Sequence, residues 1–96
     1  MKQAIDHNEI KSFLKAPWKK AGFLFVRKTH GRFRITIQSL LERRCSYLVY
    51  LWDGEKCIEG RNYSNADRIE LRSLKLALTK EMKIYFSKNY YIRKQK

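Results

Sequence analysis

Residues 46–59, SYLVYLWDGEKCIE, predict a β-hairpin and set the class of the fold. Asp53-Gly54 is a favoured pair for a two-residue type I′ turn, because both residues tolerate positive φ. Aromatic and β-branched residues, which favour extended strands, dominate residues 46–52 before the turn. We therefore expect two antiparallel strands here.

A second hairpin is expected earlier in the chain. The strand-like runs 23–28 and 32–38 are separated by a turn that we place at His30-Gly31. The second run alternates between apolar and polar residues, and its apolar side would carry Phe33, Ile35 and Ile37. The opposite side of this hairpin would then be basic.

Two arginines would face each other across that hairpin. With the turn at His30-Gly31, Arg27 lies opposite Arg34 and beside Phe25. Like charges opposite each other destabilise a sheet. A phosphate group between them would turn the repulsion into charge-assisted hydrogen bonds. The alternative is that both side chains extend into water.

Two helices are expected to flank the hairpins. Asp6 and Glu9 have the spacing of a capping box, and Pro17 would end the first helix. Ser64 and Asp67 have the same spacing before a longer helix. The core-facing stripe of that helix would be Leu71, Leu74, Leu78, Met82 and Tyr85.

This order of elements predicts a single α+β domain. We expect a short N-terminal helix, an antiparallel sheet of two hairpins with three to four strands, and a long C-terminal helix packed on one face of the sheet. Residues 1–87 would form the domain, and residues 88–96 would be a basic, aromatic C-terminal tail. A chain of 96 residues has room for one core.

Charge is the strongest functional signal in the sequence. Twenty-two Lys and Arg residues against nine Asp and Glu residues give a formal net charge of +13. The basic surplus lies before residue 39 and after residue 70. Such a surplus repels itself in a compact fold, and a polyanion would neutralise it. We therefore expect a non-catalytic protein that binds nucleic acid, DNA or RNA.

The candidate contacts combine cations with two tyrosines that would stack on unpaired bases. They are Arg27, Lys28, Arg32, Arg34, Arg72, Lys75, Lys88, Tyr90, Tyr91, Arg93 and Lys94. Phe23 and Phe25 would serve either as further stacking surfaces or as core residues.

We expect no metal, cofactor or membrane partner. His7, His30, Cys45 and Cys57 lack the CxxC or HxxxH spacing of a ligand set, and Cys57 would face Tyr50 as a free thiol. No stretch approaches the roughly 18 apolar residues of a membrane span, and no signal peptide is recognised. Two cysteines without a disulfide framework indicate the reducing cytoplasm.

Two alternative functions remain open. The sequence holds no hydrolase or phosphate-loop motif, which predicts a protein that is not an enzyme. A basic ribonuclease toxin would use His30 as its general base. A small inhibitor of phage or mobile-element type, acting on a nucleic-acid-handling complex such as a host defence effector, suits the short basic chain equally well. An exposed strand edge would also permit a homodimer.

Residues 65–78 resemble the first helix of RNase H-like domains, where a catalytic Glu follows an Asn-rich cap. The resemblance would place that carboxylate at Glu70. Residues 35–38 and 87–89 lack the two catalytic Asp residues of that family, so the resemblance implies at most an inactive scaffold. In size, charge and basic antiparallel sheet, the chain is also similar to ribosome-dependent ribonuclease toxins of the RelE type, although its long last helix departs from that pattern.

Overall fold

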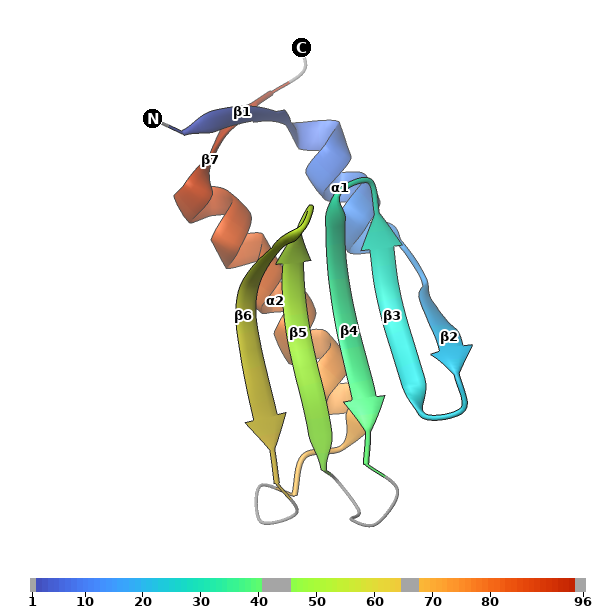
Figure 1. The fold of residues 1–96 in the computed structure, drawn as a ribbon. Coiled ribbons are helices and arrows are strands. Elements are labelled where there is room, and N and C mark those ends of the chain that lie inside the picture. Colours follow the sequence, from blue (N-terminus) through green and yellow to red (C-terminus); the bar gives the residue numbers. More distant parts are fainter. Residues whose placement is uncertain (1, 41–45, 65–67, 95–96) are drawn as a thin grey trace.

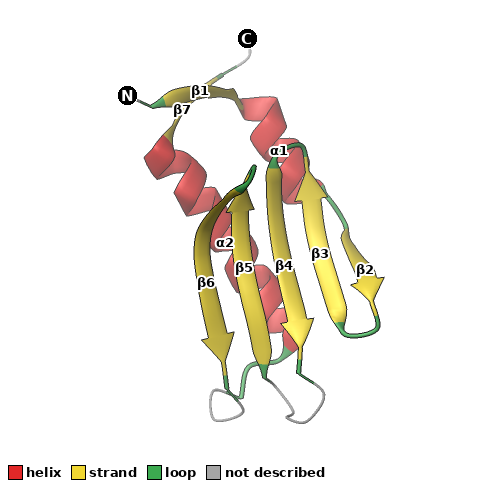
Figure 2. Ribbon diagram, viewed as in Figure 1, coloured by secondary structure: helices red, strands yellow, loops and turns green. Residues whose placement is uncertain are grey.

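The computed structural model describes residues 2–40, 46–64 and 68–94. The elements in chain order are β1 (Gln3–Asp6), α1 (His7–Lys15), β2 (Trp18–Gly22), β3 (Phe25–His30), β4 (Phe33–Ser39), β5 (Tyr47–Asp53), β6 (Lys56–Tyr63), α2 (Leu71–Asn89) and β7 (Tyr90–Arg93). Strands β2 to β6 form an antiparallel sheet in that order, and β1 pairs with β7 in a small parallel sheet. Both helices lie on one side of the large sheet (Figures 1 and 2). We call the opposite side the outer face.

The predicted α+β class, antiparallel sheet and long C-terminal helix are confirmed. The sheet has five strands instead of three to four, because Trp18–Gly22 pairs with β3 as an edge strand. Tyr90–Arg93, which the sequence placed in a tail, form β7 beside β1. Both differences arise from backbone pairing between segments with no alternating pattern of their own.

Both hairpin turns lie one residue later than predicted, at Gly31-Arg32 and Gly54-Glu55. The two glycines have φ of 59° and 63°, whereas Arg32 and Glu55 are not among the residues with positive φ. Positive φ at only the first central residue is the requirement of a type II′ turn, and glycine meets it without steric cost. Each glycine therefore takes the first turn position instead of the second.

The shifted turns change which residues face each other. The predicted pairing of Arg27 with Arg34 is wrong, because the register between β3 and β4 moves by two residues and Arg27 faces Thr36. Likewise, Cys57, an exposed free thiol, faces Trp52 instead of Tyr50. In β3 and β4 a shift of two keeps the side chains on their predicted side of the sheet, because side chains alternate with a period of two. In β6 a bulge adds one residue, so that Gly60 instead of Glu59 lies on the side of Tyr50.

The helix caps differ from the predicted ones. Asp6 is the N-cap residue of α1, but its side chain makes no capping hydrogen bond. It accepts instead from Arg93 Nη2 at 3.1 Å, which joins β1 to β7. The second predicted capping box includes Asp67, which lies outside the described residues, and α2 begins at Leu71. Cys45 also lies outside the described residues.

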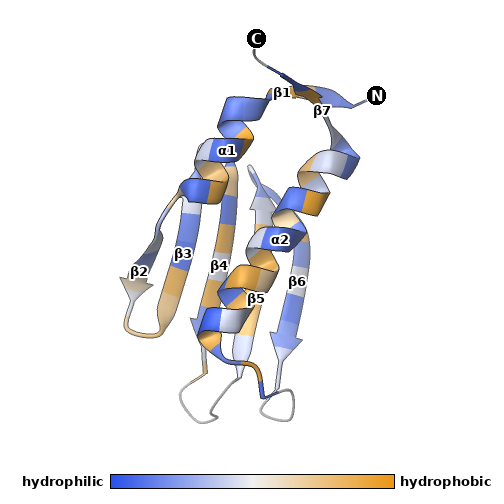
Figure 3. Cartoon of the chain, turned by 180° about the vertical axis from the view of Figure 1, so that it is seen from behind, coloured by the Kyte–Doolittle hydropathy of each residue, from blue (hydrophilic) through white to orange (hydrophobic). Residues whose placement is uncertain are grey.

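The hydrophobic core lies between the sheet and the helices (Figure 3). Phe13 of α1, Phe33 of β4 and Phe86 of α2 meet edge to face, with ring centroids 4.6 to 6.1 Å apart. The predicted stripe of α2 is buried at Leu74, Leu78 and Met82. These contacts fix both helices on the same face of the sheet.

A buried carboxylate joins this core to the ends of the chain. Asp53, at the end of β5, accepts from Arg32 Nε at 2.5 Å, from Tyr85 Oη at 2.8 Å and from Tyr90 Oη. Arg32 also donates to Tyr90 Oη and, at 3.1 Å, to Gln3 Oε1 of β1. We call these five residues the Asp53 network. They connect both hairpin ends with α2, β1 and β7.

The network also determines the ionisation of its members. Burial acts to raise the pKa of Asp53, but the hydrogen bonds from Arg32, Tyr90 and Tyr85 outweigh it and lower the pKa below its ordinary value. Burial, followed by the hydrogen bond to Asp53, raises the pKa of Tyr85 to about 12. The same two causes raise the pKa of Tyr90, so both tyrosines remain neutral donors at physiological pH.

We predict that Asp53→Asn lowers the free energy of unfolding by about 2–3 kcal/mol, because an amide cannot satisfy three donors at a buried site. Since the folded-state pKa of Asp53 is depressed, its stabilisation is complete above the unfolded-state pKa of about 3.9 and is lost as the pH falls through the native pKa. The deficit of the variant in urea unfolding should therefore shrink below about pH 4.

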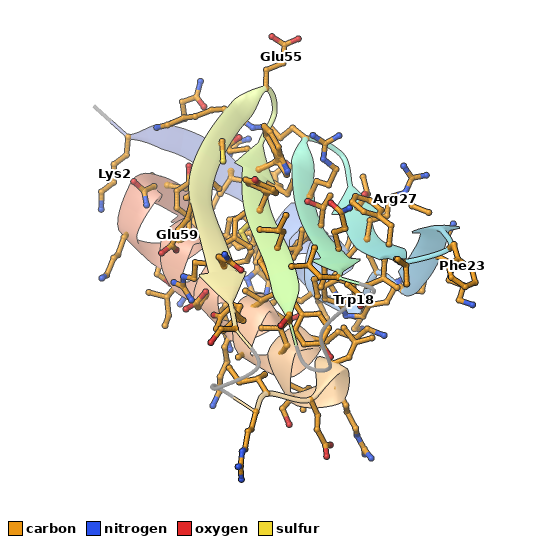
Figure 4. The ribbon with its side chains drawn as sticks, turned by 60° about the horizontal axis from the view of Figure 1, so that its bottom comes forward. Lys2, Trp18, Phe23, Arg27, Glu55 and Glu59 are labelled. Carbon is orange, nitrogen blue, oxygen red and sulfur yellow. The ribbon has the colours of Figure 1, made fainter. Side chains whose placement is uncertain are left out.

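Glu55→Gln is the matched control for this prediction. Glu55 projects from the tip of the β5–β6 hairpin (Figure 4), and its loss should leave stability unchanged. Equal stability of Asp53→Asn and the wild type at neutral pH would show that the network does not hold the fold together.

Candidate nucleic-acid interface

The outer face presents every second side chain of its strands. One row crosses the whole sheet and consists of Lys19, Arg27, Thr36, Tyr50 and Gly60, each paired with the next. The row has two cations at one end and an aromatic ring toward the other, and it contains no carboxylate.

The neighbouring row contains Thr29, Arg34, Trp52 and Cys57. Arg34 Cζ lies 4.9 Å from the centroid of the Trp52 ring, a cation–π contact. Trp52 Nε1 donates to Thr36 Oγ1 at 3.4 Å, which orients the indole. Within the described residues no carboxylate forms an ion pair with Arg34, so its charge is uncompensated.

Tyr50 lies flat on the sheet because its partner is a glycine. A Cβ atom at Gly60 would be 3.0 Å from Tyr50 Cε1, so any other residue would push the ring away. Residue Tyr50 remains 41 % exposed, and the centroid of its ring is 6.1 Å from that of Trp52, with an angle of 40° between the ring planes. Two neighbouring aromatic rings are thus held on an open surface.

These side chains surround one shallow hollow of about 330 Å³. It is lined by Phe25, Arg27, Arg34, Thr36, Tyr50 and Trp52. We call the three aromatic residues and two arginines of this set the outer-face cluster. Aromatic faces can stack on unpaired bases, and guanidinium groups can bind phosphate oxygens in a bidentate manner.

A second hollow, of about 520 Å³, continues the basic surface around the edge of the sheet. Lys15, Lys19, Arg27 and His30 contribute to its lining, which contains no carboxylate. Arg27 lines both hollows and projects outward near the β2–β3 edge, where exposed Phe23 lies (Figure 4). The cations therefore form a continuous track from the outer-face cluster toward α1.

Lys28 has a structural position. It is only 4 % exposed, and its Nζ atom donates to the carbonyl oxygens of Leu14 and Ala16 at 2.8 Å each. It thus satisfies carbonyl groups at the C-terminal end of α1, whose partial negative charge favours a cation. Burial lowers the pKa of Lys28. Its side chain is turned away from the outer face and cannot contact a phosphate there.

Arg32 and Tyr90 belong to the Asp53 network. Tyr90 is buried, so its ring is not accessible to a base. Arg32 is held first by its hydrogen bond to Asp53, which raises the pKa of its guanidinium. Both side chains are therefore engaged in hydrogen bonds that stabilise the fold.

The other candidates lie in two further places. Arg72 and Lys75 line a groove on the helical side of the sheet. At the C-terminal end are the exposed residues Lys88, Tyr91, Arg93 and Lys94, of which Arg93 pairs with Asp6. The structure therefore brings together only Arg27 and Arg34 of the eleven candidates in the outer-face cluster.

Sequence reasoning missed Tyr50 and Trp52 as members of this surface. The signal was present, because Leu48, Tyr50 and Trp52 alternate with residues that face the core, Tyr47, Val49 and Leu51. The alternation alone does not indicate which face of this strand the helices leave open.

The described residues offer no metal site, because no group of three His, Cys, Asp or Glu side chains comes together among them. Glu70, suggested by the RNase H-like resemblance, is an exposed residue at the N-cap of α2. No helix in the described part of the chain is long and apolar enough to cross a membrane. Comparisons with protein-family models, with curated proteins and with solved structures find no match.

We predict that Lys28→Met lowers the free energy of unfolding by about 1–2 kcal/mol, because two helix carbonyls lose their donor. Lys19→Met is the control. Lys19 is an exposed residue on the neighbouring strand, so its substitution should leave the free energy of unfolding unchanged. Urea unfolding monitored by circular dichroism measures both. A Lys28→Met variant as stable as the control would contradict the capping role.

Proposed function

We propose that this chain is a non-catalytic protein that binds single-stranded nucleic acid on the outer face of its sheet. The observation that carries the proposal is the outer-face cluster, in which Tyr50, Trp52 and Phe25 share one hollow with Arg27 and Arg34. Exposed aromatic rings next to unpaired guanidinium groups are the combination that binds unpaired bases together with their phosphates.

The shape of the surface favours a single strand over a duplex. The major groove of DNA admits a helix or a two-stranded ribbon, whereas the outer face is the broad side of a five-stranded sheet. In a duplex the faces of the bases are stacked on each other and are not available to Tyr50 or Trp52. An unpaired strand can lay its bases on these rings.

The track of cations gives the sugar–phosphate backbone a path. From the cluster, Arg27 leads to Lys19 on the edge strand β2 and then to Lys15 at the end of α1. Contacts of this kind supply affinity through counterion release and carry little sequence information. We therefore propose binding with weak base preference to DNA and RNA alike.

We propose binding without catalysis, because the hollow that His30 lines contains cations and hydroxyl groups but no carboxylate that could act as the partner of its imidazole. General acid–base cleavage of RNA needs one group to remove a proton and one to donate it. Incubated RNA should stay intact on a denaturing gel; cleavage that disappears in His30→Ala would favour the ribonuclease alternative.

We predict that Tyr50→Ala and Trp52→Ala each weaken binding of a labelled 12-nucleotide single strand by about tenfold, because each removes a stacking surface worth about 1–3 kcal/mol. Fluorescence anisotropy measures the affinity, and a duplex of the same sequence should bind less tightly. Tyr91→Ala is the control, because it removes a tyrosine that is even more exposed than Tyr50, at 68 %, and lies outside the cluster. If Tyr91→Ala were as damaging as Tyr50→Ala, the interface would lie at β7.

We predict that Arg27→Ala/Arg34→Ala lowers the slope of log affinity against log salt by about 1.4 on a single strand, since each lost phosphate contact contributes about 0.7. Lys11→Ala/Lys56→Ala removes two exposed charges elsewhere and should leave the slope nearly unchanged. Failure of the wild type to bind any single strand at low salt would exclude this function.

A further inference from the structure

A second concave surface lies on the helical side of the sheet. It is a groove of about 900 Å³ between the end of α1, the inner side of β2 and β3, and one side of α2. Its apolar lining comes from Leu14, Trp18, Leu76 and Ala77. Leu76 is 68 % exposed, and it shares this one groove with the other three apolar residues instead of standing alone on the surface.

One wall of the groove is formed by helix α2. Its α2 residues run from Arg72 to Lys83, which at 1.5 Å per residue corresponds to about 16 Å, or three helical turns. An elongated groove of this length matches one face of a short helix better than a compact small molecule.

All charged side chains that line the groove are basic. Four of them, Arg72, Lys75, Lys80 and Lys83, belong to α2 and form no ion pair with the described carboxylates. Lys75 Nζ also lies 5.7 Å from the centroid of the Trp18 ring, at the boundary between the apolar lining and the cations. The groove therefore combines an apolar floor with a positively charged rim.

The carboxylate of α2 nearest to these cations in sequence is directed elsewhere. Glu81 accepts from Arg61 Nη1 of β6 at 2.5 Å, on the other side of the helix from the groove lining. Arg61 is in turn held by Glu59 at 2.8 Å. The acidic groups thus neutralise the β6 side of α2, and the groove side keeps its positive charge.

We propose that this groove binds an acidic amphipathic helix of a partner protein, with apolar side chains on Trp18 and Leu76 and carboxylates on the rim. Charge complementarity selects the acidic partner, and the apolar floor selects a protein. A sugar–phosphate backbone would leave Leu14, Leu76 and Ala77 without apolar contacts. Trp18 is only half exposed and lies between the ammonium groups of Lys28 and Lys75, so a base cannot stack freely on it.

The test uses the full chain and a labelled 16-residue helical peptide with Leu at intervals of three and four residues and Glu at most other positions. A peptide of the same composition with scrambled Leu positions is the negative control. We expect the amphipathic peptide to bind, and Lys80→Glu/Lys83→Glu to weaken its affinity by about tenfold or more. Lys11→Glu/Lys56→Glu changes the net charge equally outside the groove and should cost less than about twofold at physiological salt.

A second pair of variants tests the apolar floor. Leu76→Asp should weaken the peptide by about tenfold, whereas Ile84→Asp should not, although Ile84 is also an exposed apolar residue of α2. Three results would each overturn the proposal: the scrambled peptide binds as tightly as the amphipathic one, the two double variants reduce affinity equally, or neither peptide binds at low salt.

Nucleic acid is the competing occupant, and the same variants identify it. The groove would be a nucleic-acid site if Lys80→Glu/Lys83→Glu weakened binding of a single-stranded oligonucleotide as much as binding of the peptide, and if the oligonucleotide displaced the peptide. The proposal would then be wrong. Tyr50→Ala should weaken the oligonucleotide and leave the peptide unaffected. The groove and the outer-face cluster can therefore fail independently.

Discussion

The carboxylate of Asp53 is the group on which the arrangement of this small domain depends. A buried charge is tolerated only when donors surround it, and here the donors come from the first hairpin turn, from α2 and from β7. Because Asp53 lies at the end of β5, its donors draw both hairpin ends and both chain ends together. Arg32 also donates a hydrogen bond to Gln3 of β1, which connects the parallel pair of β1 and β7 to the same network. A single side chain thus connects segments far apart in the sequence.

A chain with a net charge of +13 must also distribute its cations, and the period of the strands decides how. Arg27 and Lys28 are neighbours with opposite environments: one is exposed on the outer face, and the other is buried against the end of α1. Similarly, Arg32 is bound by a carboxylate, whereas Arg34 rests on an indole without an ion pair among the described residues. Composition alone treats these four residues as equivalent, but the side of the sheet separates structural cations from available ones.

Features of the fold that depend on the periodicity of a single segment could be predicted from the sequence. Features that depend on pairing between distant segments could not. The alternation of β4 placed Phe33, Ile35 and Ile37 in the core and Arg34 outside, and this survived an error in the register because the error was two residues. The error itself came from the preference of glycine for the first turn position. β2 has a weak strand composition and is an edge strand only because β3 lies beside it. β7 depends on a partner at the other end of the chain.

The residues of the proposed interface on the outer face are separate from the residues that stabilise the core. A 96-residue chain has few large apolar side chains to spare, yet Phe25, Tyr50 and Trp52 lie outside the core. Glycine in the interior of a strand costs about 0.5–1 kcal/mol, and Gly60 accepts that cost where it lets Tyr50 lie flat and half exposed. Neither feature helps the core, which Phe13, Phe33 and Phe86 fill from the other side. Both create an aromatic surface beside guanidinium groups that form no ion pair with the described carboxylates, and it is on this surface that the proposed binding of nucleic acid rests.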